Sequence, residues 1–243
     1  MSRLDNLQNF LSRAVNPGDD ILVHSSLKSL GFVARGADQV LDLLLNAVGP
    51  MGTLVMMTAT TGFAQSKHFD VLRTKSETGL LTEVMRLRYP DNRSFVPMTS
   101  FVASGVRASQ YTSRFNSYLD ESSPFTSLLR NRGKVLLLGV NFDRCTLYHL
   151  PEERFKVPYN DYKTFSGWGV NGLSKTLPVE QRYYVRKSLS IVKDPISVSA
   201  NFATSSLCCV GNLFPVDIYS FGAEEYVGYM SEKLIANRLC LIQ

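Results

Sequence analysis

Two short apolar runs separated by one amphipathic segment constrain the fold of this chain more than any other feature. The runs cover residues 21–23 and 53–57, and both have the length and composition of buried strands. Between them, residues 37–48 carry apolar side chains at helical spacing, which predicts a helix that ends at Gly49-Pro50. A strand, a helix and a second strand in succession form a βαβ unit, in which the two strands are parallel and the crossover is right-handed.

A third apolar run, residues 135–138, ends at Gly139 and predicts another strand that is buried on both faces. The polar residues after it are expected at the C-terminal edge of the sheet, where α/β proteins present their functional side chains. The sequence therefore predicts a single α/β domain over residues 1–243, with a β-rich C-terminal annex. Further helices are predicted over residues 4–16, 79–88, 125–132 and 222–238, further strands over 100–106, 185–192, 196–200 and 205–210, polar loops over 60–78 and 111–124, and a closing strand or tail over 239–242.

The composition is that of a globular protein, with 44% apolar and 19% charged residues. Every apolar run is far shorter than the roughly 18 residues that span a bilayer, and Asp5 interrupts any N-terminal signal sequence. We therefore expect a cytoplasmic protein without a membrane partner. The four cysteines have no metal-binding spacing and are expected to be reduced thiols.

The charge of the chain favours an anionic partner. The net charge is +5 and the isoelectric point is near 9.0. Nucleic acid, a membrane surface and a phosphate-bearing small molecule all meet this condition. Because the basic residues are scattered along the chain instead of massed in one stretch, the sequence predicts no nucleic-acid partner.

The segment after the third apolar run contains the first candidate site. If residues 146–153 are helical, Thr146, His149 and either Glu152 or Glu153 project from one face. A carboxylate beside an imidazole raises its basicity and holds one tautomer, as a general base requires. The alternative is an ordinary helix start, in which Thr146 caps the helix. Pro151 is tolerated only in a first turn, so the helix is expected to begin after Thr146.

The end of the first apolar run contains the second candidate site, His24-Ser25-Ser26. A strand that ends in small hydroxyl residues before a glycine-containing loop can offer backbone N–H groups to an oxyanion or a phosphate. Lys28 and Arg35 follow in that loop. The alternative is an ordinary turn between a strand and a helix. Neither G-x-G-x-x-G nor the Walker pattern is present, so those routes to nucleotide binding are not supported.

Other catalytic motifs are weak in this chain. The nucleophile elbow G-x-S-x-G is missing, although Ser25 or Ser100 could serve a hydrolase in another geometry. The three histidines do not form H-E-x-x-H, so no catalytic metal is predicted. His68 lies in the polar loop and is expected to be a solvated side chain.

Several stretches together resemble one family, the aminoglycoside N-acetyltransferases that act on the 3-amino group. They are ILVHSSLKSLG (21–31), LLNAVGPMGTLVM (44–56), TGLLTEVMRLRYPDNRS (78–94), SSP (122–124) and GKVLLLGVNFDRCTLYHLPEE (133–153). The stretches occur in the family's order within residues 4–165, and the last is the most specific.

The resemblance implies a three-layer α/β/α sandwich, with a largely parallel or mixed central sheet, that transfers an acyl group directly from acetyl-CoA or another acyl-CoA to an amine. His149 would be the general base, Glu152 its orienting partner or a substrate contact, and Thr146 a neighbour of the thioester. A homo-oligomer is compatible with these features. The residues that would hold CoA are His24, Ser25, Ser26, Leu27, Lys28, Arg35 and Gly36.

The sequence also departs from the family pattern. Phe95-Val96 follow Arg93-Ser94 where a histidine is common, and residues 60–78 have no acidic run opposite a polycationic drug. The acceptor is expected to be an amino sugar, either linked to a nucleotide or of the aminoglycoside type. With a net charge of +5, these departures favour the nucleotide-linked sugar. The competing interpretations are a serine-type hydrolase, which needs no CoA, and a non-catalytic basic binding module.

Overall fold

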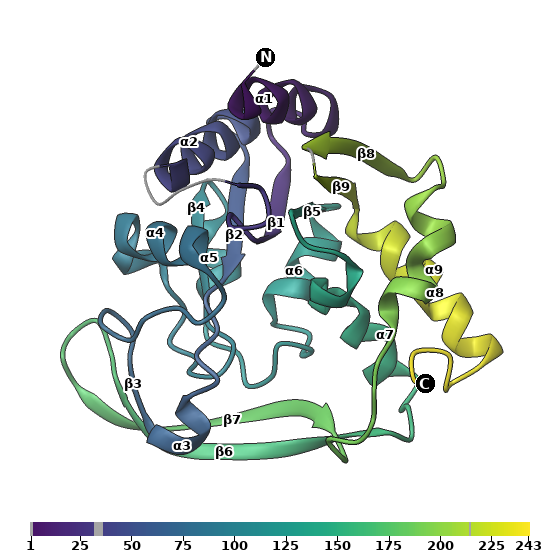
Figure 1. Ribbon diagram of the computed structural model, residues 1–243. Helices are drawn as coiled ribbons and strands as arrows, with labels where there is room; N and C mark the ends of the chain where they lie inside the picture. The colour runs from purple at the N-terminus through teal and green to yellow at the C-terminus, as the bar shows by residue number, and fades with distance from the viewer. Residues whose placement is uncertain (1, 32–35, 214) are drawn as a thin grey trace.

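The core of the protein is a six-stranded mixed sheet with the strand order β4-β2-β1-β5-β9-β8 (Figure 1). The computed structural model describes residues 2–31, 36–213 and 215–243. The central strands β2, β1 and β5 are parallel, whereas β4, β9 and β8 run antiparallel to their neighbours. The predicted mixed α/β fold is confirmed. The strands are β1 (Asp20–Ser25), β2 (Thr53–Met57), β4 (Phe101–Gly105), β5 (Lys134–Leu138), β8 (Cys208–Leu213) and β9 (Val216–Gly222).

Helices cover both faces of this sheet, because successive side chains of each central strand enter opposite cores. In β1, Ile21 and Val23 pack in one core and Leu22 packs in the other. All five residues of β2 are buried, as the apolar run 53–57 predicts. The first core includes α1 (Arg3–Ala14), α2 (Gly36–Val48) and α4 (Leu80–Arg88), and the second includes α5 (Ala108–Thr112), α6 (Pro124–Arg130), α8 (Pro195–Ala203) and α9 (Ala223–Ala236).

A second sheet lies beside the first, below it in Figure 1. It consists of the long hairpin β6 (Asn160–Val170) and β7 (Thr176–Arg186), with β3 (His68–Asp70) added parallel to β6. A small core of its own includes residues from α3 (Phe63–Ser66). The β-rich part is therefore inserted between β5 and α8 and is joined by one strand from the predicted polar loop.

Some predicted elements are wrong. Residues 196–200 were expected to be a strand but lie in α8, which begins with Pro195 and is capped by Asp194. The aspartate accepts the N–H of Ser197, so capping and an N-terminal proline override the alternation of the side chains. The predicted loop 111–124 begins inside α5, and residues 239–242 form only one isolated bridge, from Lys193 to Ile242.

One buried cation attaches the segment 60–78 to the main sheet. The Arg93 guanidinium donates to the carbonyls of Thr58, Val71 and Thr74 at 2.9, 3.2 and 2.6 Å. The residue is 5% exposed, and burial lowers the pKa of Arg93 to about 9. Because buried carbonyls need donors, Arg93 orders this otherwise irregular segment.

We expect Arg93→Met to lower the free energy of unfolding more than the same substitution of an exposed arginine. The variant leaves the carbonyls of Val71 and Thr74 without this donor, and an unsatisfied buried group costs about 1–3 kcal/mol. The Thr58 carbonyl still accepts from the Ser100 hydroxyl. Arg73→Met is the matched control, because the Arg73 side chain is 90% exposed and lies in the same region. Urea denaturation should show a large loss for the first variant and less than about 0.5 kcal/mol for the second. Equal losses would contradict the anchoring role.

Candidate active site

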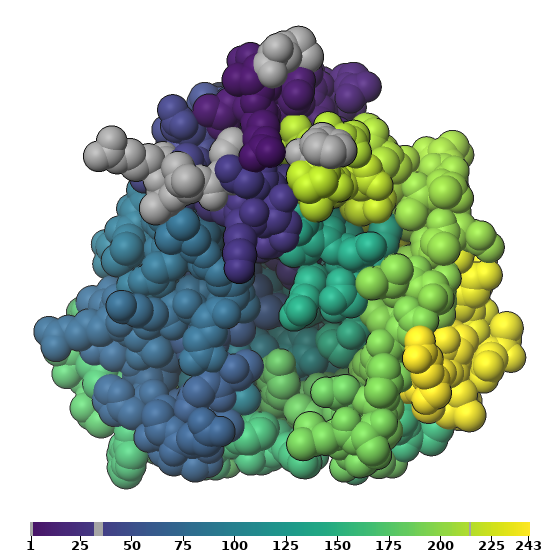
Figure 2. Space-filling model, in the orientation of Figure 1, coloured from purple at the N-terminus to yellow at the C-terminus, as the bar shows by residue number. Residues whose placement is uncertain are grey.

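A cavity of about 990 Å³ opens at the C-terminal ends of the parallel strands β1 and β5. In Figure 2 a hollow lies between the turn after β1, drawn in purple, and the segment after β5, drawn in teal. Ligand sites of α/β sheets form at this edge because the loops that follow parallel strands meet there. The two sequence motifs singled out above therefore lie at one site.

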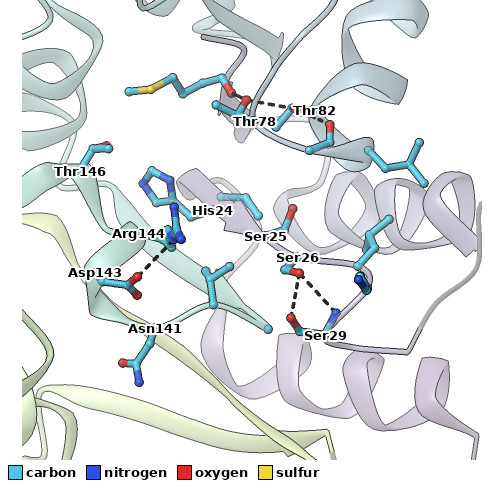
Figure 3. A pocket seen from close by; sticks show the side chains of 18 of the residues that line it. His24, Ser25, Ser26, Ser29, Thr78, Thr82, Asn141, Asp143, Arg144 and Thr146 are labelled. Carbon is cyan, nitrogen blue, oxygen red and sulfur yellow. Dashed lines mark hydrogen bonds and ion pairs between the residues drawn. The ribbon is translucent and has the colours of Figure 1, made fainter. Parts of the chain in front are cut away.

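Most of the residues predicted to hold CoA line this cavity. His24, Ser25 and Ser26 point into it from the end of β1, and Arg144 and Thr146 from the segment after β5 (Figure 3). Gly36 is the first residue of α2, is buried, and is not one of the described lining residues. Arg35 lies outside the described residues. The other predicted residues on the wall are Leu27 and Lys28.

The two walls are joined by the backbone. The Ser26 N–H donates to the carbonyl of Leu138 at 2.9 Å, which extends the pairing of β1 and β5 into the turn. Gly139 then adopts a φ of +69°, and a Cβ there would lie 2.8 Å from the Ser26 carbonyl. Only glycine meets both conditions at low cost, so the residue that ends the predicted strand also permits the close approach of the two motifs.

Two buried polar atoms on the wall, His24 Nε2 and Thr146 Oγ1, have no hydrogen-bond partner among the residues that the structure describes. Burial lowers the pKa of His24 to about 4, so its imidazole is neutral at physiological pH. Unpaired buried polar groups are rare in folded proteins, because each costs the free energy of its lost hydration. These two atoms are therefore suited to a ligand that brings its own polar groups into the cavity.

The predicted histidine–carboxylate pair forms next to this wall. The short 3-10 helix η3 (Thr146–Tyr148) follows η2 (Phe142–Arg144) and leads into α7 (His149–Arg154). Because α7 begins at His149, Pro151 lies in its first turn, as expected. His149 Nδ1 lies 2.5 Å from Glu152 Oε2. Glu153 pairs instead with Lys156 at the surface, which decides between the two glutamates.

Glu152 is completely buried and is held by donors from other parts of the chain. The Tyr159 hydroxyl donates to Oε1 at 2.9 Å, and the Asn160 amide donates to Oε2 at 3.0 Å. The Lys193 ammonium lies 2.8 Å from both oxygens. Sequence analysis missed these three residues, because no spacing relates positions that approach only through the fold.

The electrostatics of the pair suit a general base. Burial lowers the pKa of His149, and the Glu152 carboxylate opposes this effect. The imidazole is therefore neutral near pH 7 and donates from Nδ1 to the carboxylate, which leaves the Nε2 lone pair available. The His149 side chain is 18% exposed, and it is not a described lining residue of the cavity. Thr146, three positions before His149 in the chain, is the cavity-lining residue that lies nearest to it in sequence.

The family assignment follows from comparison with known proteins. The family model described as aminoglycoside 3-N-acetyltransferase matches residues 22–232. The chain belongs to this family. The match includes both candidate motifs, so the resemblance of the sequence stretches is confirmed.

Curated relatives of the same family match a shorter part of the chain. The YokD protein of Bacillus subtilis (strain 168), described as prophage-derived and aminoglycoside N(3')-acetyltransferase-like, is 32% identical over 167 residues, 58% of this chain and 60% of that protein. Aminoglycoside N(3)-acetyltransferase III of Serratia marcescens is 34% identical over 165 residues, 59% and 61% of the two chains. The matched part thus spans about 60% of the length of these relatives.

Solved structures of the family share the whole fold. Aminoglycoside acetyltransferase AAC(3)-IIb superimposes with a TM-score of 0.82 at 25% identity and covers 96% of this chain and 97% of its own. The YokD structure from Bacillus subtilis gives a TM-score of 0.77 at 26% identity, with 96% and 98% covered. The second sheet and α8, which the sequence stretches do not reach, therefore belong to the family's architecture.

Two further properties of the described residues concern metal binding and membrane insertion. Within the described residues, no group of three or more histidine, cysteine, aspartate or glutamate side chains could hold a metal ion. A search of the same residues finds no helix long and apolar enough to cross a membrane.

We expect the free energy of unfolding to fall as the pH decreases from 6.5 towards 4. The pKa of His24 lies below that of an unfolded histidine, so the unfolded chain binds protons that the folded chain does not, and stability is lost below the unfolded value. The contribution is up to about 3 kcal/mol, and the lowered pKa of His149 acts in the same direction. The variant His24→Phe should flatten the pH dependence of urea denaturation. An unchanged pH profile would contradict a neutral, buried His24.

Proposed function

We propose that this protein is an acyl-CoA-dependent N-acyltransferase that moves an acetyl group from acetyl-CoA to an amino group of an amino sugar. The observation that carries the proposal is the buried His149–Glu152 pair, three residues after the cavity wall at Thr146. Membership in a family described as aminoglycoside 3-N-acetyltransferase supports the same reaction.

The cavity fits the polyanionic CoA in several respects. Its volume of about 990 Å³ is at the upper end of ordinary ligand sites. Lys28 and Arg144 bring positive charge to its wall, although Arg144 pairs with Asp143 and Glu77 also lines the cavity. The helix α4 begins there, with Thr78, Gly79 and Leu80 among the lining residues. The first N–H groups of a helix have no acceptor within the helix, so they suit a phosphate. Acetyl-CoA, when bound, supplies an acetyl thioester activated for transfer.

The residues of the chain then divide the work. Glu152 accepts a hydrogen bond from the Nδ1–H of His149. This hydrogen bond orients the ring and leaves Nε2 as the base for the acceptor amine. Nε2 takes a proton from the acceptor's ammonium group, which frees the nitrogen lone pair that acyl transfer requires. The new C–N bond forms as the thioester C–S bond breaks and CoA leaves. Thr146 Oγ1 and His24 Nε2, which have no partner within residues 2–31, 36–213 and 215–243, are available to hydrogen-bond the acyl donor.

The structure makes the alternative functions less favourable. Ser100 is fully buried, and its hydroxyl is engaged with Thr58 and Arg93, so it does not serve as a nucleophile. Ser25 lies on the cavity wall, but within the part of the chain that the structure describes no hydrogen bond joins it to His149. A non-catalytic binding module would not require a buried histidine–carboxylate pair beside a large cavity.

The first test is acetyl transfer by the His149→Ala variant. We expect CoA thiol release with acetyl-CoA and an amino-sugar acceptor to fall by roughly 10²–10⁴-fold, because the general base is lost. His68→Ala is the matched control, since His68 is an exposed residue on β3 and should leave the rate unchanged. Thiol release at the same rate in wild type and His149→Ala would overturn the proposal.

The second test concerns the acceptor. The relatives are named for aminoglycosides, whereas the net charge of +5 led us to expect a nucleotide-linked amino sugar. We propose the nucleotide-linked sugar, because its diphosphate suits a basic protein. Turnover of a dTDP- or GDP-linked amino sugar should exceed that of kanamycin-like drugs under equal acetyl-CoA. Activity on the drugs alone would contradict this choice.

A further inference from the structure

Lys193 is a buried cation that the reaction described above does not use. Its side chain is 10% exposed, and its ammonium lies 2.8 Å from both carboxylate oxygens of Glu152. It also lies 5.4 Å from the ring centres of Tyr148 and Tyr159, within the range of a cation–π contact. Two aromatic faces and a bidentate contact with a buried carboxylate form a site built for a positive charge.

The backbone on the C-terminal side of Lys193 is also held. Asp194 caps α8, and its N–H donates to the carbonyl of Leu241 at 2.9 Å. Lys193 itself forms an isolated bridge with Ile242, and the amide of Gln243 donates to Asp194. The ammonium is therefore delivered to Glu152 by a chain segment fixed at α8 and at the end of the described chain.

We infer that Lys193 is a positioning residue that supplies the counter-charge for Glu152 and thereby keeps His149 in the neutral form that can accept a proton. The inference rests on the proposed function of His149 as the base. A buried carboxylate needs one positive charge nearby. When Lys193 provides it, the imidazole can remain neutral. Without Lys193, the remaining partner able to become positive is His149, and a protonated imidazole cannot accept a proton from the acceptor.

The other titratable groups around the pair do not supply this charge. Burial raises the pKa of the surrounding phenols and thiols, so they are neutral at physiological pH. Arg186 donates to the carbonyl of Ile191, and among the described residues no hydrogen bond or ion pair joins it to Glu152. Glu153 is paired with Lys156, and Asp194 is engaged with Ser197 and Gln243. The neutral groups are Tyr118 before α6, Tyr148 in η3, Tyr159 just before β6, Tyr184 in β7 and Cys240 after α9.

The test is an NMR titration of the imidazole carbons and nitrogens, which is simple because the chain has three histidines. In Lys193→Met, the pKa of His149 should rise by about one pH unit or more, the size expected when an opposing charge this close is removed. The acid limb of kcat/KM should move to higher pH by the same amount, with activity recovered at alkaline pH. Lys193→Arg should keep the wild-type profile, because it keeps the charge.

Controls separate this role from a merely structural one. Lys156→Met removes an exposed lysine that pairs with Glu153 and should leave both the titration and the rate unchanged. If Lys193→Met does not fold, Lys193→Gln carries the test, because its amide can still donate a hydrogen bond to Glu152 but carries no charge. The pKa of His149 should rise in that variant as well.

The outcomes also separate this inference from the proposed function. A pKa of His149 that is the same with and without Lys193, or an activity loss that is equal at every pH, would overturn the inference even if acetyl transfer is confirmed. If the wild type transfers no acetyl group, the proposed function fails, while the titration still reports whether Lys193 sets the charge of His149.

Discussion

One buried carboxylate, that of Glu152, holds the candidate active site together. A completely buried charge is tolerated only when donors and a counter-charge surround it, and here they come from distant parts of the chain. His149 approaches from the same helix, Tyr159 and Asn160 from the start of β6 and the turn before it, and Lys193 from the segment before α8. The position of the base therefore depends on the docking of the second sheet and of the C-terminal helices, as well as on α7.

The central sheet supplies the second constraint. Because β1 and β5 are neighbours and parallel, the residues after each strand meet at one edge, and His24 and Thr146 face the same cavity. Gly139 allows the two loops to approach closely enough for the pairing to continue beyond the strands. The antiparallel strands β4 and β9 pair with the outer sides of β2 and β5, so neither strand lies between β1 and β5.

The two histidines of the site are neutral for different physical reasons. Burial lowers the pKa of His24, and no charged side chain in the described part of the chain opposes this effect. Burial also lowers the pKa of His149, but a carboxylate 2.5 Å away opposes it, and Lys193 balances that carboxylate. One imidazole is thus suited to contact a ligand, whereas the other combines a neutral state with a fixed tautomer, which a base requires.

The sequence by itself determined the features that depend on local geometry. The βαβ unit follows from hydrophobic periodicity, and the approach of His149 to a glutamate follows from helical spacing, with Pro151 setting the first turn of α7. The alternation in 196–200 misled because capping at Asp194 favours a helix. Only the tertiary structure decided that Glu152, not Glu153, faces the ring, and that Lys193, 41 residues from Glu152, completes the pair. A buried charge needs partners that are close in space, and sequence spacing does not predict which distant residues the fold brings together.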